Sequence, residues 1–185
     1  MPRILIALTL ALTAAIGPAL AQTEETPDAQ PEVPQIEVEP PMTMARLGAI
    51  MTLIDEAAVV EPGGISLTVA NVPVTIIGDP RANRMRILVP ISSAAGLTEA
   101  EMLRILQANF DTALDARYAV ANDRLWSTFI HPLAELTQDQ VISGLAQTVT
   151  LAQTYGDTYT SGAIMFGGGD TRSLIEELRN LGEEL

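Results

Sequence analysis

The chain has 185 residues, and its 23 acidic side chains outweigh ten basic ones, all arginine, which gives a formal net charge of −13 at pH 7. Binding to nucleic acid or to an anionic membrane surface is therefore not expected, because both require a basic face. The chain has no cysteine and a single histidine, His131, so disulfides, thiol nucleophiles and a structural zinc site are not expected either. Nothing in the composition indicates a metal ion or another cofactor.

Residues 1–21 have the pattern of a cleavable signal peptide. Arg3 supplies a positive charge, an apolar run extends from Ile4 to Ile16, and an A-x-A cleavage site follows at residues 19–21. As a helix the apolar run spans roughly 20 Å, which is too short for a hydrocarbon core of about 30 Å. We therefore expect cleavage between Ala21 and Gln22, no stable membrane insertion afterwards, and a periplasmic or secreted protein.

Residues 22–42 are expected to form a disordered acidic linker. They contain five prolines and six acidic residues but no basic residue. Such a segment cannot bury enough apolar surface to offset the entropy lost on ordering. A folded domain is expected over residues 43–155, followed by a glycine-rich hinge and a C-terminal helix over residues 156–185.

The first half of this domain is expected to be a helix followed by three strands. Apolar residues recur at helical spacing from Met44 to Ile54. Asn71 and the segment 79–83 have the composition of turns. Alternating or β-branched runs around these turns predict strands. The strands are expected over residues 65–70, 72–77 and 84–91, as an antiparallel meander.

The second half is expected to be a helix, a hairpin and another helix. Thr98 with Glu101, and Thr137 with Gln140, match the capping-box pattern, so helices should begin at both places. The hairpin is expected over residues 117–121 and 125–130. The predicted fold class is α+β, with an antiparallel five-stranded sheet, the order α-β-β-β-α-β-β-α, and a short C-terminal helix.

Reactive side chains are few, and no catalytic, cofactor-binding or metal-binding residue is assigned. His131 lies at the end of an expected strand, where a surface or edge position is the simplest interpretation. The acid pairs Asp55–Glu56 and Asp111–Asp115 are typical of solvated helix ends, although a hydrolytic pair within a cleft stays open. The glycines at 167–169 lack the lysine of a phosphate-binding loop, so a hinge explains them better.

Two groups of apolar residues are candidate partner-binding sites. Trp126 and Phe129 are three positions apart on one strand, so they should lie on opposite faces. One of the two can contribute to an exposed apolar surface, although packing under a helix explains either. Leu174, Leu178 and Leu181 form a stripe on the C-terminal helix, which either packs on its own domain or acts as a lid hinged at residues 167–169.

Several motifs resemble the type III secretion chaperone-like fold and, within it, the YbjN family, whose members are called bacterial sensory transduction regulators. These motifs are Leu-Gln-Ala-Asn-Phe-Asp at 106–111, Arg-Leu-Trp at 124–126 and the Asn-Val-Pro-Val hairpin at 71–74. The resemblance extends over roughly residues 43–155. It implies a protein-binding α+β domain that is often dimeric, and it carries over no catalytic residue.

Together these features predict an exported, non-enzymatic protein-interaction module of the YbjN type, chaperone-like or regulatory. Its expected partners are a protein client or regulator and a second copy of itself, because the helix from Thr98 has more apolar side chains than one sheet face needs. A small-ligand-binding or hydrolytic envelope protein with a cleft between sheet and helices is the alternative, and a structural envelope protein is a third. The scarcity of histidine, cysteine and lysine favours binding over catalysis.

Overall fold

The structure is a computed structural model that describes residues 39–111, 114–156 and 169–182. The expected signal peptide, most of the linker and residues 167–168 of the expected hinge lie outside these ranges. In chain order the elements are α1 (Met44–Ile54), β1 (Val59–Glu61), β2 (Gly64–Val69), β3 (Val72–Asp79), β4 (Arg84–Ser93), α2 (Glu99–Asp111), β5 (Arg117–Ala121), β6 (Arg124–His131), α3 (Gln138–Gln153) and α4 (Gly169–Gly182). No helix in these ranges has the length and apolar character needed to cross a membrane.

The strands form one antiparallel sheet in the order β1-β2-β3-β4-β6-β5. The predicted α+β class is thus confirmed, but the predicted number of five strands is wrong because β1 is a sixth. Strand β1 has three residues, all of them exposed, so it produces no alternating pattern in the sequence. It turns into β2 through Gly63, whose φ of 81° suits a glycine.

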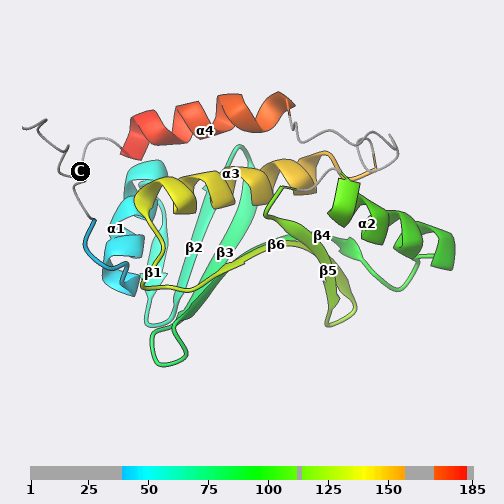
Figure 1. Ribbon diagram of the computed structural model, residues 1–185, viewed down its shortest axis with the longest axis horizontal. Coiled ribbons are helices and arrows are strands. Elements are labelled where there is room, and N and C mark those ends of the chain that lie inside the picture. Colours follow the sequence, from blue (N-terminus) through cyan, green and yellow to red (C-terminus); the bar gives the residue numbers. More distant parts are fainter. Residues whose placement is uncertain (1–38, 112–113, 157–168, 183–185) are drawn as a thin grey trace, which may run out of the picture. The chain divides into compact units, whose positions relative to one another are not determined.

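Helices α1, α3 and α4 lie on one side of the sheet (Figure 1). Helix α3 contacts β4 and β6, and α1 contacts β2. Helix α3 comes close to the sheet at Gly144, where an added Cβ would lie 2.8 Å from the ring of Phe129. The core between sheet and helices is therefore shaped by a glycine on the helix and an aromatic ring on the sheet.

Both expected capping boxes are present and explain where two helices begin. The Thr137 hydroxyl accepts a hydrogen bond from the Gln140 N–H, and the Gln140 side chain accepts one from the Thr137 N–H. At α2, the N–H of Thr98 donates to Glu101 over 2.8 Å, and the N–H of Glu101 donates to the Thr98 hydroxyl over 3.3 Å. These bonds satisfy donors that a helix N-terminus otherwise leaves free.

The packed domain extends beyond residues 43–155 at both ends. Met42 is buried, and its N–H donates to the carbonyl of Ala134 over 3.1 Å. At the other end, Leu178 of α4 is 3% exposed and belongs to the main core. The side chain of Gln138 also donates to the carbonyl of Gly182 over 2.8 Å. Helix α4 is therefore part of the core, as in the packing alternative stated for it above.

Candidate functional site: protein-binding surfaces

Helix α2 carries a row of large apolar side chains that face solvent. Its other side is anchored by Ile105 and Ala108, which are buried against β5 and β6 residues. A helix that is apolar on both sides is normally buried on both sides. The solvent-facing side chains, which we call the α2 stripe, are Met102, Leu103, Leu106 and Phe110, exposed to 44, 56, 65 and 81% respectively.

An asparagine holds α2 against the edge of the sheet. The side-chain oxygen of Asn109 accepts from the N–H of Tyr118 over 2.7 Å, and its amide donates to the carbonyl of the same tyrosine over 3.1 Å. The Tyr118 hydroxyl donates in turn to the carbonyl of Leu151 in α3. The α2 stripe is thereby fixed in position relative to the sheet.

The same contact limits strand addition, one way in which a sheet can bind an extended segment. Asn109 occupies both backbone hydrogen-bonding groups of Tyr118 on the edge strand β5. At the opposite edge, β1 offers only three residues, and short edge strands are a common protection against pairing. A partner is therefore better accommodated on a face than along an edge.

The two aromatic candidates lie on opposite faces of β6. Phe129 is 6% exposed beneath α3, with its ring stacked on that of His131 at 5.9 Å, so it is a core residue. Trp126 lies on the face that no described helix covers. Its indole N–H donates to the carbonyl of Ala121 over 3.0 Å, and the Arg124 guanidinium lies 5.8 Å from its ring centre. Of the pair, only Trp126 is placed to meet a partner.

The three leucines of α4 do not form one open surface. Leu178 is buried, Leu174 is partly buried against the core, and Leu181 is 43% exposed. Trp126 and these leucines lie on different sides of the sheet, so the structure does not bring the sequence-derived candidates together. The sequence signal that could identify the α2 stripe was the excess of apolar residues after Thr98.

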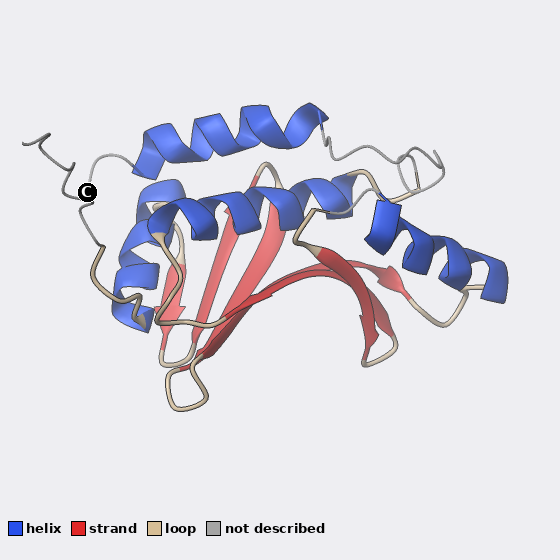
Figure 2. Ribbon diagram, in the orientation of Figure 1, coloured by secondary structure: helices blue, strands red, loops and turns tan. Residues whose placement is uncertain are grey.

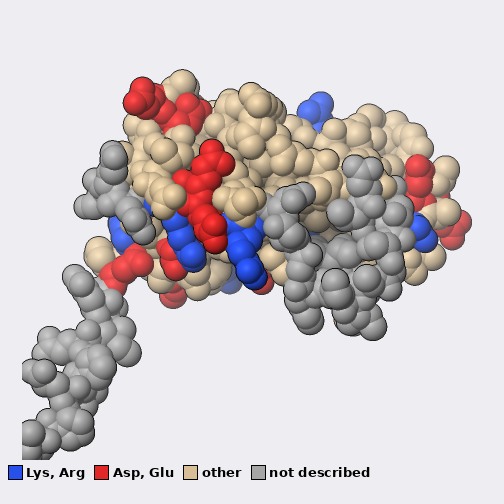
Figure 3. All heavy atoms as spheres, turned by 90° about the horizontal axis from the view of Figure 1, so that it is seen from above, with Lys and Arg blue, Asp and Glu red and all other residues tan. Residues whose placement is uncertain are grey.

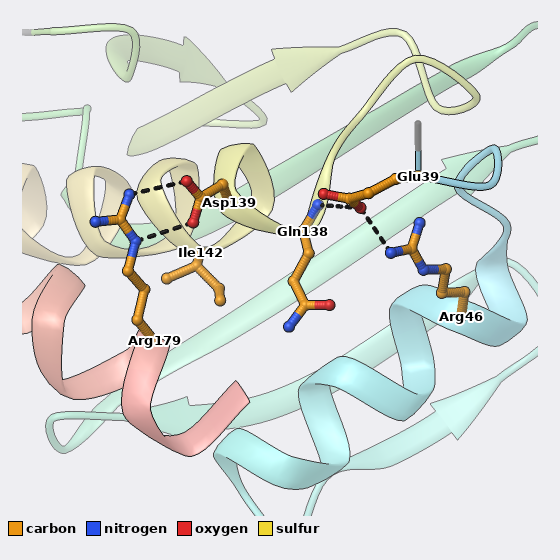
Figure 4. Close-up of a pocket in the computed structure, with 6 residues that line it drawn as sticks. All are labelled: Glu39, Arg46, Gln138, Asp139, Ile142 and Arg179. Atoms are coloured by element: carbon orange, nitrogen blue, oxygen red, sulfur yellow. Dashed lines mark hydrogen bonds and ion pairs between the residues drawn. The ribbon is translucent and has the colours of Figure 1, made fainter. Parts of the chain in front are cut away.

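A pocket of about 320 Å³ lies between the start of the domain and helices α1, α3 and α4 (Figure 4). Two ion pairs cross it: Arg46 to Glu39 at 2.6 Å, and Arg179 to Asp139 at 2.9 Å. The carboxylate of Glu39 also accepts from the N–H of Gln138, at the start of α3. That bond, together with the Arg46 guanidinium, holds the pKa of Glu39 below its usual range. The pocket residues that complete the lining are Gln138 and Ile142.

The ion pairs and hydrogen bonds of this pocket hold elements of the fold together, and the pocket is not a cleft between the sheet and the helices. Both of its arginines are already paired with carboxylates, so an anionic ligand would have to displace an existing partner. Seen from the side of α4, acidic and basic side chains lie next to each other (Figure 3). The alternative of a small-ligand site therefore gains no support from its geometry.

The acids considered for hydrolysis have structural roles where the structure describes them. The carboxylate of Asp55 accepts from the N–H groups of Ala57 and Thr68. Asp115 exchanges bonds with the side chain of Gln147, which donates to its carboxylate and accepts from its N–H. Among the described residues, no three of His, Asp and Glu come close enough together to hold a metal ion.

Comparison with known proteins places the fold. No protein-family model matches the sequence, and no curated protein matches it. Among solved structures, the crystal structure of the ExsC–ExsE complex is similar with a TM-score of 0.50 and 13% identity, over 66% of this chain and 99% of the other. The HopA1–SchA chaperone–effector complex aligns over 77% of this chain and 99% of the other at 14% identity, but its TM-score of 0.36 is too low to indicate a shared fold. The chain thus has an α+β, type III secretion chaperone-like fold.

Proposed function

We propose that this protein is a non-enzymatic protein-interaction module of the YbjN type, chaperone-like or regulatory, that pairs with a second copy of itself. The observation that carries the proposal is the α2 stripe. The chaperone-like fold supports it, and so do two of the acids considered for catalysis: the carboxylate of Asp55 accepts from backbone N–H groups, and that of Asp115 accepts from the side chain of Gln147.

Self-pairing follows from the physical character of the α2 stripe. It consists of apolar side chains only, and burying a fully exposed leucine or phenylalanine contributes about 1.5–3 kcal/mol. Two copies related by a twofold axis bring the same stripe together from both sides, because such an interface is self-complementary. Asn109 fixes the helix beforehand, so little conformational freedom is lost on pairing.

The test is sedimentation equilibrium of the mature protein over a range of concentrations. We expect a species of twice the monomer mass to predominate at micromolar concentration and to dissociate on dilution. A monomer mass throughout the range would contradict the proposed pairing.

We also propose that the protein acts outside the cytoplasm, after removal of residues 1–21. The support is the apolar run from Ile4 to Ile16 followed by the A-x-A site. Intact-mass spectrometry of the protein from an envelope fraction is expected to give the mass of a chain that begins at Gln22. Recovery of the chain with Met1 to Ala21 still attached would contradict cleavage.

A further inference from the structure

The uncovered face of β4, β6 and β5 is basic, although the chain as a whole is strongly acidic. These three strands contain four arginines and neither aspartate nor glutamate. The basic residues of β4 alternate with the buried Met85 and Ile87 and therefore point away from the core. The basic residues of β5 and β6 point the same way, opposite the buried Tyr118 and Leu125. The four are Arg84, Arg86, Arg117 and Arg124.

Apolar side chains lie between these arginines. Arg86 pairs in register with Ile77 of β3 on one side and with Ile130 of β6 on the other. The two isoleucines are 40% and 53% exposed. Further along the same face, the register brings Leu88 beside Thr128, and Trp126 follows. The face therefore combines positive charge with apolar contact area.

In the described part of the chain, no arginine of this face forms an ion pair with a carboxylate. The ion pairs found there join Arg46 to Glu39 and Arg179 to Asp139, and neither includes an arginine of this face. The guanidinium of Arg117 donates to the carbonyls of Leu114 and Ala116. Both acceptors are neutral carbonyls, so these hydrogen bonds bring no negative charge to the guanidinium.

Of the other arginines, Arg84 attracts the carboxylate of Glu135, which accepts hydrogen bonds from the side-chain amide of Asn83. Arg84 donates to the carbonyl of Asn83, and Arg124 lies over the ring of Trp126. The nearest acid in register is Asp79, opposite Arg84, and its carboxylate accepts from the N–H groups of the turn that follows it. The side chain of Arg86 is exposed and has no hydrogen-bond or ion-pair partner among the described residues, so it is the most available cation of the four.

The sheet is bent so that this face lies on the inner side of the curve. Figure 2 shows the strands arching away from α3 towards β5. Thr128 points to this face and is only 8% exposed, although no described helix covers it. Neighbouring side chains on the inner side of the bend therefore already enclose the centre of the face.

We propose that this face binds an extended segment of a partner protein in which carboxylates are interspersed with apolar side chains. Carboxylates would pair with Arg86 and its neighbours, and the apolar residues would cover Ile77 and Ile130. A nucleic acid or an anionic membrane fits less well, because a net charge of −13 repels a large polyanion as a whole. A short acidic segment meets mainly the local field, because charges beyond about 10 Å are screened at ordinary salt. The proposal goes beyond the pairing through α2, since it concerns a different surface.

The experiment measures fluorescence anisotropy of a short labelled peptide composed of glutamate and valine, titrated with the mature protein. We expect saturable binding that weakens with added salt, and weaker binding of the same peptide with glutamine in place of glutamate. Arg86→Glu is expected to reduce the affinity about tenfold, because charge pairs across an interface are converted into repulsion. Arg172→Glu is the matched control: it makes the same change in net charge on an exposed residue of α4, and it should bind like the wild type.

The proposal is overturned if the glutamine peptide binds as tightly as the glutamate peptide, if neither binds, or if Arg172→Glu weakens binding as much as Arg86→Glu. Duplex DNA or anionic vesicles that bind through Arg86, when the acidic peptide does not, would also overturn it. A variant with serine in place of Leu106 and Phe110 separates the two surfaces. If that variant is monomeric but binds the peptide, both proposals stand. If the wild type pairs but binds no peptide, only the proposal for the sheet face fails.

Discussion

Replacing Leu106 and Phe110 together by serine is expected to weaken self-association about a hundredfold. Both side chains belong to the α2 stripe and are exposed by 65% and 81% in a single chain. In a twofold pair both chains carry the two changes, so even half-burial of the four side chains makes the loss about 3 kcal/mol in total, and each 1.4 kcal/mol corresponds to a tenfold change in Kd. The measurement is sedimentation equilibrium of the variant and the wild type under the same conditions.

Gln107→Ser provides the control on the same helix. Gln107 is exposed but lies outside the α2 stripe, and polar residues at the rim of an interface contribute little to affinity. The unfolding transitions of the double variant, Gln107→Ser and the wild type should be compared at a concentration where each is monomeric. They should be similar, because the exposed stripe does not stabilise the isolated domain. Equal association by the double variant and the wild type would show that α2 is not the interface.

Phe129→Ala is expected to lower the free energy of unfolding by about 3–5 kcal/mol, the usual range for removing a buried aromatic ring. The ring is 6% exposed and fills the space beneath Gly144 of α3. Its removal leaves a cavity where α3 packs closely on the sheet. Urea denaturation followed by circular dichroism measures the loss.

Gly144→Ala tests the same contact from the helix side. The added Cβ would lie 2.8 Å from two ring carbons of Phe129, so ring or helix must shift, at a cost of about 1–3 kcal/mol. Combining Gly144→Ala with Phe129→Leu should cost less than the sum of the two single changes, because the smaller side chain makes room for the methyl group. Strict additivity would mean that the two residues do not press on each other.

The helices that begin with a capping box could be predicted from the sequence, and strand β1 could not. Thr98 and Thr137 each combine a hydroxyl with an acid or amide three residues later, and this short-range chemistry forms whatever the rest of the chain does. Strand β1 depends entirely on its neighbour β2 for hydrogen bonds. A strand of three exposed residues has no local signal of its own.

Domain boundaries were harder to predict because they depend on contacts between distant residues. Met42 and Leu178 are buried by residues far away in the sequence, and no local pattern reports such burial. Strand β4 was predicted to end at Ile91 but continues to Ser93. A register shift between Pro90 and Ser92 interrupts the alternation on which the prediction relied.

The candidate surfaces also differ in how far local sequence could predict them. The excess of apolar residues after Thr98, which can be counted along one element, led to the prediction that this helix pairs with a second copy of the chain. The basic face could not be found in that way, because Arg86, Arg117 and Arg124 come from three strands and meet only in the sheet. The net charge of the chain gives no information about this face, because it does not report where individual charges lie.

The most direct measurement is the reactivity of a single introduced thiol. Because the chain has no cysteine, such a thiol reports on one position alone. Leu106→Cys places a thiol in the α2 stripe, and Arg172→Cys places one on the exposed side of α4. If the α2 stripe is covered by a second copy, the thiol at position 106 should react more slowly with a maleimide as protein concentration rises, in proportion to the paired fraction. The thiol at position 172 should react at a constant rate. Equal, concentration-independent reactivity at both positions would contradict the conclusion that α2 is a protein interface.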